Sequence, residues 1–562
     1  MPRRSRPIRE IAPDEIFLDS SNLPRRNDPQ FEARVVRPLE SRALAGVGIV
    51  FVVVLVVFVA RSFDLGVVHG ATYAEVSREN RLDRSVVFAT RGIVYDRTGQ
   101  RIAWNEALAG TTTAPFALRR YVDIPGLSLL IGFVRYPKKD ANGEWWREET
   151  IGVSGVELAF DALLAGKNGS TMVEVDALGN MDEQNIITPP KEGTDMTLSI
   201  DVEVQNKLFS FLSAHAKRQG FQGGAAVIMN VRTGELLALT SFPEYDHAAF
   251  TEGDTKAVRE ASLDPGTPLL NRAVSGVYTP GSIVKPIFAA AALNEGIVDP
   301  ETEILSRGAI TIPNPYDPEH PSVYRDWTVH GLIDIREAIA VSSDEYFYTI
   351  GGGYGSQAGL GIKRLDEYAR RFGLGAPSGI ALLGEEAGII PTPEWKAATF
   401  GPDDPWRIGN TYHTAIGQYG FQITPLQAAR LIAAVANGGK LLVPQIVTSS
   451  TPQYLKVNVS DRHLQVVREG MRLAVTSSRQ DATVKILNIP GVDIAAKTGT
   501  AQIGISNQWI NSWSVGFWPS SDPRYAYAVV LERAPAGTLS GAAPGLRPFF
   551  EWLIANKPEY VN

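Results

Sequence analysis

The chain has 562 residues, of which 44% are hydrophobic and 20% charged, and its formal net charge is −7. This length has room for roughly two to four domains with a large core, and the acidic balance gives no indication of a nucleic-acid partner. The absence of cysteine excludes disulfides, thiol nucleophiles and cysteine-ligated zinc.

An uncharged stretch near the N-terminus predicts a membrane anchor. Residues 43–60 contain 18 residues without a charge, and Arg42 and Arg61 close the run. At the rise of an α-helix this run spans about 27 Å, close to the hydrocarbon thickness of a bilayer. About forty residues precede the run and no A-x-A site follows it, which disfavours a cleaved signal peptide. We predict one transmembrane helix over residues 43–60.

The basic residues beside this run predict its orientation. Arg34, Arg37 and Arg42 lie closest to the membrane on its N-terminal side, where the positive-inside bias counts most. We therefore expect a mostly disordered cytoplasmic tail over residues 1–42 and an extracytoplasmic, periplasmic location from residue 61 onward. No second apolar run of comparable length occurs in the sequence, which predicts a single-pass protein of the cytoplasmic (inner) membrane.

The region after the anchor has the pattern of short strands. We predict a strand over 93–95 and a turn over 96–99, and we favour a structural hairpin over a catalytic role there. Residues 137–147 form a polar loop with two tryptophans, which is either a surface hairpin or a partner contact. Residues 155–164 show helical periodicity that ends at Gly166.

A second region begins near residue 196, where a linker-like Pro-Pro-Lys-Glu-Gly segment ends. Asp201 is a candidate N-cap of a helix, and Gly220 is a candidate stop for it. Two apolar strands, over 225–231 and 235–241, form a predicted hairpin.

The end of the chain supplies further strands. We predict them over 494–496 and after residue 500, over 513–518 and over 525–532, and a last helix over 548–554. Strands at both ends of the region, with mostly helical sequence between them, predict an antiparallel sheet that is completed late in the chain. The predicted fold class is α+β.

A serine and a lysine three residues apart are the first candidates for chemistry. Ser282 and Lys285 stand at a predicted helix start, and their spacing places both on one helical face. A lysine in an apolar, cation-rich pocket loses its proton more easily and can act as a base toward the serine. Free N–H groups at a helix start also face an incoming oxyanion. Chance supplies this spacing about once in such a chain, so alone it is weak.

Ser342-Ser343-Asp344 is the second candidate motif. It follows an apolar-periodic segment, and its hydroxyl is either a proton relay for Lys285 or a helix cap.

Lys497-Thr498-Gly499-Thr500 contains the single Lys-Thr-Gly of the chain. On an edge strand, Lys497 and the two threonine hydroxyls would bind a carboxylate, and Gly499 would keep the strand flat so that substrate approaches its backbone. Together, the order Ser-x-x-Lys, Ser-x-Asp, Lys-Thr-Gly is highly specific.

Histidines give weaker signals. The seven histidines show no short metal-binding spacing. His330 follows Asp326 by four residues, which would place both on one face of a helix. We interpret the two as a surface pair in preference to a metal site.

These motifs, with several others, make the chain resemble the class B penicillin-binding proteins, which are monofunctional peptidoglycan transpeptidases. The stretches that carry the resemblance are Arg91-Gly92 with Asp96-Arg97 and Gly99, Gly155-Val156-Glu157, Tyr278 to Ser282, Ile416 to Gln427, and Lys497 to Gln502.

Within class B the chain is more similar to the elongation-type subgroup, penicillin-binding protein 2. Asp326-Trp327, His330-Gly331 and the segment from Ser342 to Tyr348 carry that similarity. The family usually has asparagine at the position of Asp344, whereas elongation-type members often have aspartate there.

The resemblance implies the penicillin-recognising serine-transferase fold, with an antiparallel sheet and a helical subdomain, that serine β-lactamases share. On this basis we expect residues 61–195 to form an extended, mainly-β pedestal of the dimerisation type, and residues 196–562 to form the transpeptidase domain.

The resemblance also implies a mechanism. Neutral Lys285 would deprotonate Ser282, which attacks the penultimate D-Ala of a stem pentapeptide, while the N–H groups of Ser282 and Thr500 hold the oxyanion. Ser342 would pass the proton to the departing D-Ala. The catalytic candidates are Ser282, Lys285, Ser342, Asp344 and Lys497, and the substrate-binding candidates are Thr498, Gly499 and Thr500. A minor D,D-carboxypeptidase activity is also implied, without a metal or organic cofactor.

The implied partners are stem pentapeptides, β-lactam antibiotics, which acylate Ser282, and the SEDS-type glycosyltransferase of the elongation machinery. Two alternatives stay open: a division-specific class B transpeptidase, and a non-catalytic β-lactam sensor or scaffold. Rounded cells on depletion of the protein would favour elongation, whereas filaments would favour division.

Overall fold

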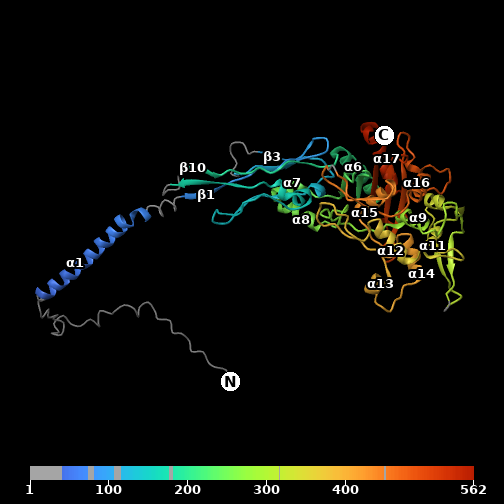
Figure 1. Cartoon of the computed structure of the whole chain (residues 1–562), viewed down its shortest axis with the longest axis horizontal. Coiled ribbons are helices and arrows are strands. Elements are labelled where there is room, and N and C mark those ends of the chain that lie inside the picture. Colours follow the sequence, from blue (N-terminus) through green and yellow to red (C-terminus); the bar gives the residue numbers. More distant parts are fainter. Residues whose placement is uncertain are drawn as a thin grey trace, which may run out of the picture. The chain divides into compact units, whose positions relative to one another are not determined.

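The computed structural model describes residues 41–73, 82–106, 115–175, 181–314, 317–448 and 451–561 (Figure 1). The chain forms two compact units, one of residues up to Asp83 with Met172–Gln184, and the other of Arg84–Thr171 with Asn185–Asn562. The predicted cytoplasmic tail lies outside the described residues except for residues 41 and 42, which begin the first helix.

Helix α1 (Ser41–Phe63) contains the predicted membrane anchor and continues into the short helix η4 (Asp64–Val68). Residues 45–68 are long and apolar enough to cross a membrane, and no other helix in the described ranges meets this criterion. The helix continues past Arg61, where the prediction ended it, and Arg61 forms an ion pair with Asp64 at 2.6 Å.

Short strands dominate the region after the anchor, as predicted. Its elements are β1 (Leu82–Val87), β2 (Val94–Tyr95), β3 (Arg101–Glu106), β4 (Leu118–Tyr121), α3 (Ser128–Ile131), β5 (Val134–Arg135), β6 (Lys138–Lys139), β7 (Trp145–Arg147), β8 (Ile151–Gly152), α4 (Gly155–Ala159), α5 (Asp161–Leu164), β9 (Gly169–Val175), β10 (Met181–Thr188) and β11 (Met196–Thr197). The sheets have the orders β1-β9-β10, β11-β2-β3-β4, β5-β8 and β6-β7.

The tryptophan loop is a surface hairpin made of β6 and β7. Trp145 packs against Phe88, with ring centroids 5.1 Å apart, and Lys139 lies 4.8 Å above the Trp145 ring. Trp146 is exposed and stacks with Arg147. The prediction of a surface hairpin is therefore confirmed. The other interpretation, a partner contact, stays a prediction.

A buried ion-pair network explains two of the family motifs in this region. Glu157, in α4, has no exposed surface, and its two carboxylate oxygens accept from Arg91 Nε at 2.6 Å and Arg119 Nε at 2.8 Å. Arg91 also pairs with Asp161 at 2.7 Å. Because these charges are buried, each needs its partner to offset the loss of hydration. The motif residues here are structural, in agreement with the interpretation of this region as non-catalytic.

The second region contains one five-stranded antiparallel sheet of order β13-β12-β22-β21-β20. Its strands and flanking helices are α6 (Val202–Gln219), β12 (Gly223–Asn230), β13 (Leu236–Phe242), β20 (Ala495–Ile503), β21 (Trp509–Trp518), β22 (Tyr525–Pro535) and α17 (Ala542–Asn556). The predicted α+β architecture, with a sheet completed late in the chain, is confirmed.

The local signals for α6 were also correct. The Asp201 carboxylate accepts from the N–H groups of Glu203 and Val204 at 3.0 Å, and Gly220 ends the helix in the left-handed conformation at φ 79°. Figure 1 shows α6 and α17 side by side although they stand at opposite ends of the region. The predicted start of α17 was wrong, since the helix begins at Ala542 and contains Pro548 in its interior.

The remaining elements form the helical part and its small hairpins. They are α7 (His247–Glu252), α8 (Thr255–Leu263), η5 (Gly281–Val284), α9 (Lys285–Asn294), β14 (Ile304–Ser306), β15 (Ala309–Ile312), β16 (Ser322–Arg325), β17 (Gly331–Ile333), α10 (Ile335–Val341), α11 (Asp344–Gly352), α12 (Gly361–Arg371), α13 (Pro393–Phe400), α14 (Ile408–Ala415), α15 (Pro425–Ala436), β18 (Lys440–Leu442), β19 (Tyr454–Lys456), α16 (Asp461–Thr476), η6 (Lys485–Leu487) and η7 (Pro558–Tyr560).

The two faces of the large sheet pack in two different apolar clusters. On β22, Val529 packs with α6 and α17, whereas its neighbours Ala528 and Val530 pack in the cluster that contains α9 and α15. This alternation is the period of a strand that is covered on both sides. The helix that follows Ser282, α9, belongs to the cluster on one face of the sheet.

Glu157 gives a test of the buried network. We expect Glu157→Gln to lower the free energy of unfolding by about 3–5 kcal/mol, because it leaves buried Arg119 without its counter-charge and Arg91 with Asp161 alone. The matched control is Glu252→Gln, which removes an exposed ion pair to Arg120 and is expected to cost less than about 1 kcal/mol. Thermal and urea unfolding of both variants measure the difference, and equal effects would contradict a structural role for Glu157.

Candidate active site

Ser282 lies in η5, a single tight turn that leads directly into α9. Gly281 has φ 55°, in the region that favours glycine, and its N–H donates to the Gly417 carbonyl at 2.9 Å. A Cβ on Gly417 would lie 2.2 Å from the Gly281 oxygen, so side chains are excluded from this contact. This backbone contact, with the Trp513 indole that donates to the Thr279 carbonyl at 2.9 Å, holds the turn, which leaves Ser282 half-buried in the wall of a cavity.

Lys285 is the first residue of α9, and its side chain has no exposed surface. Its Nζ donates to the Ser342 carbonyl at 2.7 Å and lies 3.4 Å from Ser342 Oγ. It also forms an ion pair with Asp344 Oδ1 at 2.6 Å. No hydrogen bond joins Lys285 to Ser282 in the part of the chain that the structure describes. Catalytic hydrogen bonds are often long in unliganded enzymes, so this does not exclude Lys285 as a base.

Ser342 ends α10 in the left-handed conformation, with φ 58°. Few residues other than glycine adopt this conformation, and strain of this kind gathers at functional sites. The turn points Ser342 Oγ at two amines: Lys497 Nζ at 2.7 Å and Lys285 Nζ at 3.4 Å. Ser342 therefore bridges the two lysines that sequence reasoning selected.

Lys497 lies in β20, where its side chain is completely buried. Its Nζ donates to Ser342 Oγ at 2.7 Å and to the Thr498 carbonyl at 2.8 Å. Burial and the nearby charge of Lys285 lower the pKa of Lys497 well below its ordinary value, and Asp344 opposes the shift only in part. This environment favours the neutral amine at Lys497.

The residues of β20 that follow Lys497 face alternately in two directions. Thr498 and Thr500 line the cavity, together with Gln502, as expected for alternate residues of a strand. Gly499 faces the serine turn instead, because a Cβ there would lie 2.8 Å from the Pro280 oxygen and 2.9 Å from an Ile283 methyl. Gly499 therefore makes room for the turn that carries Ser282. The expectation that it keeps the strand flat for the approach of substrate stays a prediction.

The cavity has a volume of about 1010 Å³ and is lined by Ser282, Ser342, Asp344, Thr498 and Thr500. The structure thus brings together five of the eight predicted site residues at one surface. Lys285, Lys497 and Gly499 lie behind it.

Sequence reasoning missed much of the remaining wall. An aromatic group from four separate segments contributes Trp327, Tyr348, His413 and Tyr419, and a loop contributes Gln480, Asp481, Ala482 and Thr483. Trp327, Tyr348 and Tyr419 stood in family stretches but were not named as site residues, and no pattern in the sequence marked His413 or the loop.

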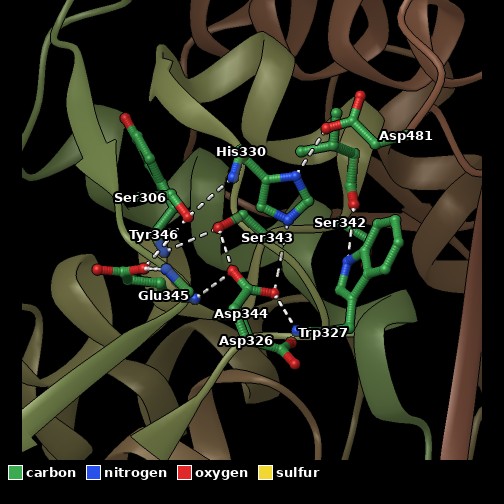
Figure 2. Close-up of polar contacts among 12 residues, drawn as sticks. Ser306, Asp326, Trp327, His330, Ser342, Ser343, Asp344, Glu345, Tyr346 and Asp481 are labelled. Carbon is green, nitrogen blue, oxygen red and sulfur yellow. Dashed lines mark hydrogen bonds and ion pairs between the residues drawn. The ribbon is translucent and has the colours of Figure 1, made fainter.

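Asp326 and His330 are not a surface pair, and they do not share a helix. Both side chains are completely buried in the connection between β16 and β17, and Asp326 Oδ1 lies 3.5 Å from His330 Nε2. Figure 2 shows His330 between Asp326 and Asp481, whose Oδ2 accepts from His330 Nδ1 at 2.8 Å. The surface interpretation was wrong because it considered only neighbours in the sequence. Asp481, which binds His330, stands 151 residues away.

These buried charges stabilise one another. Burial opposes ionisation of Asp326, but its contacts with His330, Ser343 and the Glu345 N–H lower its pKa to about 2. Burial also opposes the charged form of His330, but Asp326 and Asp481 outweigh it and raise the pKa of the imidazole.

Two family models match the chain. The model of the penicillin binding protein transpeptidase domain matches residues 224–551, which is more than half of the chain, and that of the penicillin-binding protein dimerisation domain matches residues 105–198. The chain belongs to the penicillin-binding protein transpeptidase family. The dimerisation match agrees with the pedestal that the resemblance implied.

Curated relatives and solved structures extend the family match. The peptidoglycan D,D-transpeptidase MrdA of Acinetobacter baumannii is 33% identical over 73% of this chain, which spans 62% of that relative's length. MrdA of Escherichia coli is 27% identical over 86% of this chain and 90% of the relative.

Among solved structures, Pseudomonas aeruginosa PBP2 in complex with WCK 5153 is 28% identical, with a TM-score of 0.68 over 85% of this chain and 100% of that chain. A peptidoglycan synthase complex, described for its structural coordination of polymerization and crosslinking, contains a chain that is 26% identical. Its TM-score is 0.69 over 92% of this chain and 99% of that chain.

The backbone of Ser342 gives a test of the geometry. We expect the free energy of unfolding of Ser342→Gly to be about 1 kcal/mol higher than that of Ser342→Ala. Glycine adopts the left-handed conformation without the strain that alanine has there. Both variants should be less stable than the wild type, since two buried lysines lose the hydroxyl that they contact.

The matched control is the same pair of substitutions at Asn458, an exposed residue with φ 56°. The glycine variant should again be the more stable of the two. If the variants at Ser342 lose stability relative to the wild type and those at Asn458 do not, the difference is the contribution of the lysine contacts. Equal stability of the two Ser342 variants would contradict backbone strain at this turn.

Proposed function

We propose that this protein is a peptidoglycan D,D-transpeptidase of the elongation type, which cross-links stem peptides through an acyl-enzyme on Ser282. The observation that carries the proposal is the half-buried Ser282 in the wall of a cavity that Ser342 also lines, where Ser342 connects the buried Lys285 and Lys497. Membership of the transpeptidase family and the similarity to MrdA support the same function.

The chemistry is acyl transfer from one stem peptide to another. Ser282 Oγ attacks the carbonyl of the penultimate D-Ala, the peptide bond to the terminal D-Ala breaks, and the Ser282 ester forms. The backbone N–H groups of Ser282 and Thr500 stabilise the oxyanion. The amine of a neighbouring stem peptide then attacks the ester, which restores the Ser282 hydroxyl. A minor D,D-carboxypeptidase activity follows when water is the acceptor.

The contacts of Lys285 require a proton shift before it can act as a base. Lys285 forms an ion pair with Asp344 at 2.6 Å, whereas burial and the nearby Lys285 lower the pKa of Lys497. Ser342 Oγ lies within reach of both nitrogens, so Lys285 can pass a proton to Ser342 while Ser342 passes its own to Lys497. The product is a neutral Lys285 beside Ser282 and a charged Lys497 beside Thr498 and Thr500. The terminal carboxylate of the donor peptide favours this state, because it lies against Lys497.

The roles of the site residues follow from this arrangement. Ser282 is the nucleophile, Lys285 the base, and Ser342 the relay that returns a proton to the departing D-Ala amine. Lys497, Thr498 and Thr500 recognise the carboxylate. Gly499 acts indirectly, by allowing β20 to approach the serine turn.

The family also supports proposals about location and partners. The apolar helix α1 is a membrane anchor, and we propose that it crosses once, with a cytoplasmic N-terminus and a periplasmic catalytic domain. β-Lactams acylate Ser282 as mimics of the donor. A SEDS-type glycosyltransferase of the elongation machinery is the proposed partner, which the likeness to a chain of a peptidoglycan synthase complex supports. Failure of the two proteins to co-purify would contradict that partnership.

The domain limits likewise stay a proposal: a tail over 1–42, the membrane helix over 43–60, a pedestal over 61–195 and the transpeptidase domain over 196–562.

An exchange assay tests the proposed activity. The full-length protein in detergent should replace the terminal D-Ala of a synthetic stem pentapeptide with a labelled D-amino acid, because the acyl-enzyme accepts an amine. Ser282→Ala should abolish the exchange, since no ester forms. The control is Ser262→Ala, which removes an exposed hydroxyl in α8 and should leave the exchange at the wild-type rate. Exchange by Ser282→Ala at the wild-type rate would overturn the function.

Asp344→Asn tests the proton shift. Asp344 raises the pKa of the buried Lys497, so loss of its charge should lower that pKa further. The charged Lys497 that holds the carboxylate is then lost at lower pH, and the alkaline limb of the pH profile for acylation should move to lower pH. The measurement is the rate of acylation by a fluorescent penicillin across pH 5–9. Asp522→Asn, which removes an exposed ion pair to Arg232, should leave the profile unchanged. An alkaline limb that stays in place or moves to higher pH would contradict the assignment of a charged Lys497 to carboxylate recognition.

A further inference from the structure

Three buried ionisable residues next to the site have no part in the chemistry above. Asp326 and His330 have no exposed side-chain surface, and Asp481 is one-fifth exposed at the cavity wall. Burial of such charges costs several kcal/mol per ion unless each finds a partner. Their contacts show what this cluster connects.

One end of the cluster lies under the Ser342–Asp344 turn. Asp326 Oδ2 accepts from Ser343 Oγ at 2.7 Å and from the Glu345 N–H at 2.9 Å, so it holds the residues on both sides of Asp344 (Figure 2). Trp327, the next residue, donates from its indole to the Val341 carbonyl at 3.2 Å. The turn that places Ser342 between the lysines is thus held from below by one short loop.

The other end of the cluster lies in the loop that forms the opposite wall of the cavity. Asp481 Oδ2 accepts from His330 Nδ1 at 2.8 Å, and Arg479 binds both Asp481 and the His330 carbonyl. Farther along, the Thr483 N–H donates to the Ala340 carbonyl at 3.2 Å. His330 joins the two walls together with Arg479 and Thr483, and it is the side chain that touches one carboxylate from each wall.

We propose that His330 is a positioning residue that couples the Ser342–Asp344 turn to the 479–483 loop, and so fixes Ser342 Oγ between Lys285 and Lys497. His330 touches neither lysine. It acts through Asp326 and Ser343 on one side and through Asp481 on the other. The proposal rests on the proposed function, since its measure is acylation of Ser282.

The charged groups around His330 give the direction of its pH dependence. Asp326 faces it from its own loop, Asp481 and Arg479 from the 479–483 loop, and Glu337 of α10 lies 3.7 Å from Arg479. On the α11 side, Glu345 accepts from Ser306 Oγ, which in turn accepts from the His330 N–H at 3.4 Å.

Two carboxylates against one imidazole favour the imidazolium, in line with the raised pKa of His330. A raised pKa means that the stabilising contact is fully present below the ordinary histidine pKa, and is lost as pH rises through the folded-state value. The coupling should therefore weaken on the alkaline side.

Acylation kinetics with a fluorescent penicillin test the proposal on the full-length protein in detergent. His330→Gln should lower the acylation rate constant roughly ten- to a hundredfold, because misplacement of a catalytic group by a fraction of an ångström has effects of this size. Non-covalent affinity for the penicillin should change little. In the wild type, the acylation rate should decline at alkaline pH as His330 loses its proton. His330→Gln should lack this decline.

Asp481→Asn is the second variant, and it keeps the experiment decisive if His330→Gln does not fold. It removes one carboxylate from His330 and leaves both lysines untouched, so the alkaline decline should move to lower pH. The matched control is His320→Gln, which removes an exposed histidine that pairs with Asp317 at 2.9 Å and should behave as the wild type.

The outcomes separate the two proposals. An unreactive wild type would overturn the proposed function itself. A reactive wild type with unchanged acylation rate and alkaline decline in His330→Gln and Asp481→Asn would overturn the positioning role alone. A fall in rate that only follows a fall in melting temperature, with the alkaline decline in place, would also overturn it, since that is the result of general destabilisation.

Discussion

The site depends on one hydroxyl held between two buried amines. Ser342 Oγ lies 2.7 Å from Lys497 Nζ and 3.4 Å from Lys285 Nζ, and the lysines come from α9 and β20. Two ammonium groups this close repel each other strongly in a buried site, so the structure favours one charge shared between them. In the proposed mechanism, this shared charge makes one lysine available as a base while the other recognises a carboxylate.

Several features of the fold serve to keep this hydroxyl in place. The left-handed turn at Ser342 points it at the lysines, and the loop with Asp326 and His330 holds that turn from below. Close backbone contacts at Gly281, Gly417 and Gly499 bring the serine turn against β20. The same need for close packing therefore explains glycines that stand in three separate motifs.

Local chemistry made much of the fold predictable. The N-cap at Asp201, the stop at Gly220 and the hairpin of β12 and β13 depend on residues near one another in the sequence, and all three were predicted correctly. The late completion of the sheet followed from strand patterns at both ends of the region. The membrane helix was found from its uncharged run, although its C-terminal end was placed too early.

The errors concern contacts between distant residues. Ser342 and Lys497 stand 155 residues apart, and His330 and Asp481 stand 151 apart. Motif order indicated that Ser342 and Lys497 share a site, but spacing gave no sign of the ion pair between Lys285 and Asp344. It also gave no sign that Asp326 and His330 are buried, or that Gly499 faces Pro280. These contacts depend on how loops pack, and the periodicity of a sequence does not predict loop packing.

Peptide mapping of the penicillin-treated protein tests the central claim most directly. The account predicts one adduct per chain, located by mass spectrometry on the peptide that contains Ser282. An adduct on a different residue, or no adduct on folded protein, would contradict it.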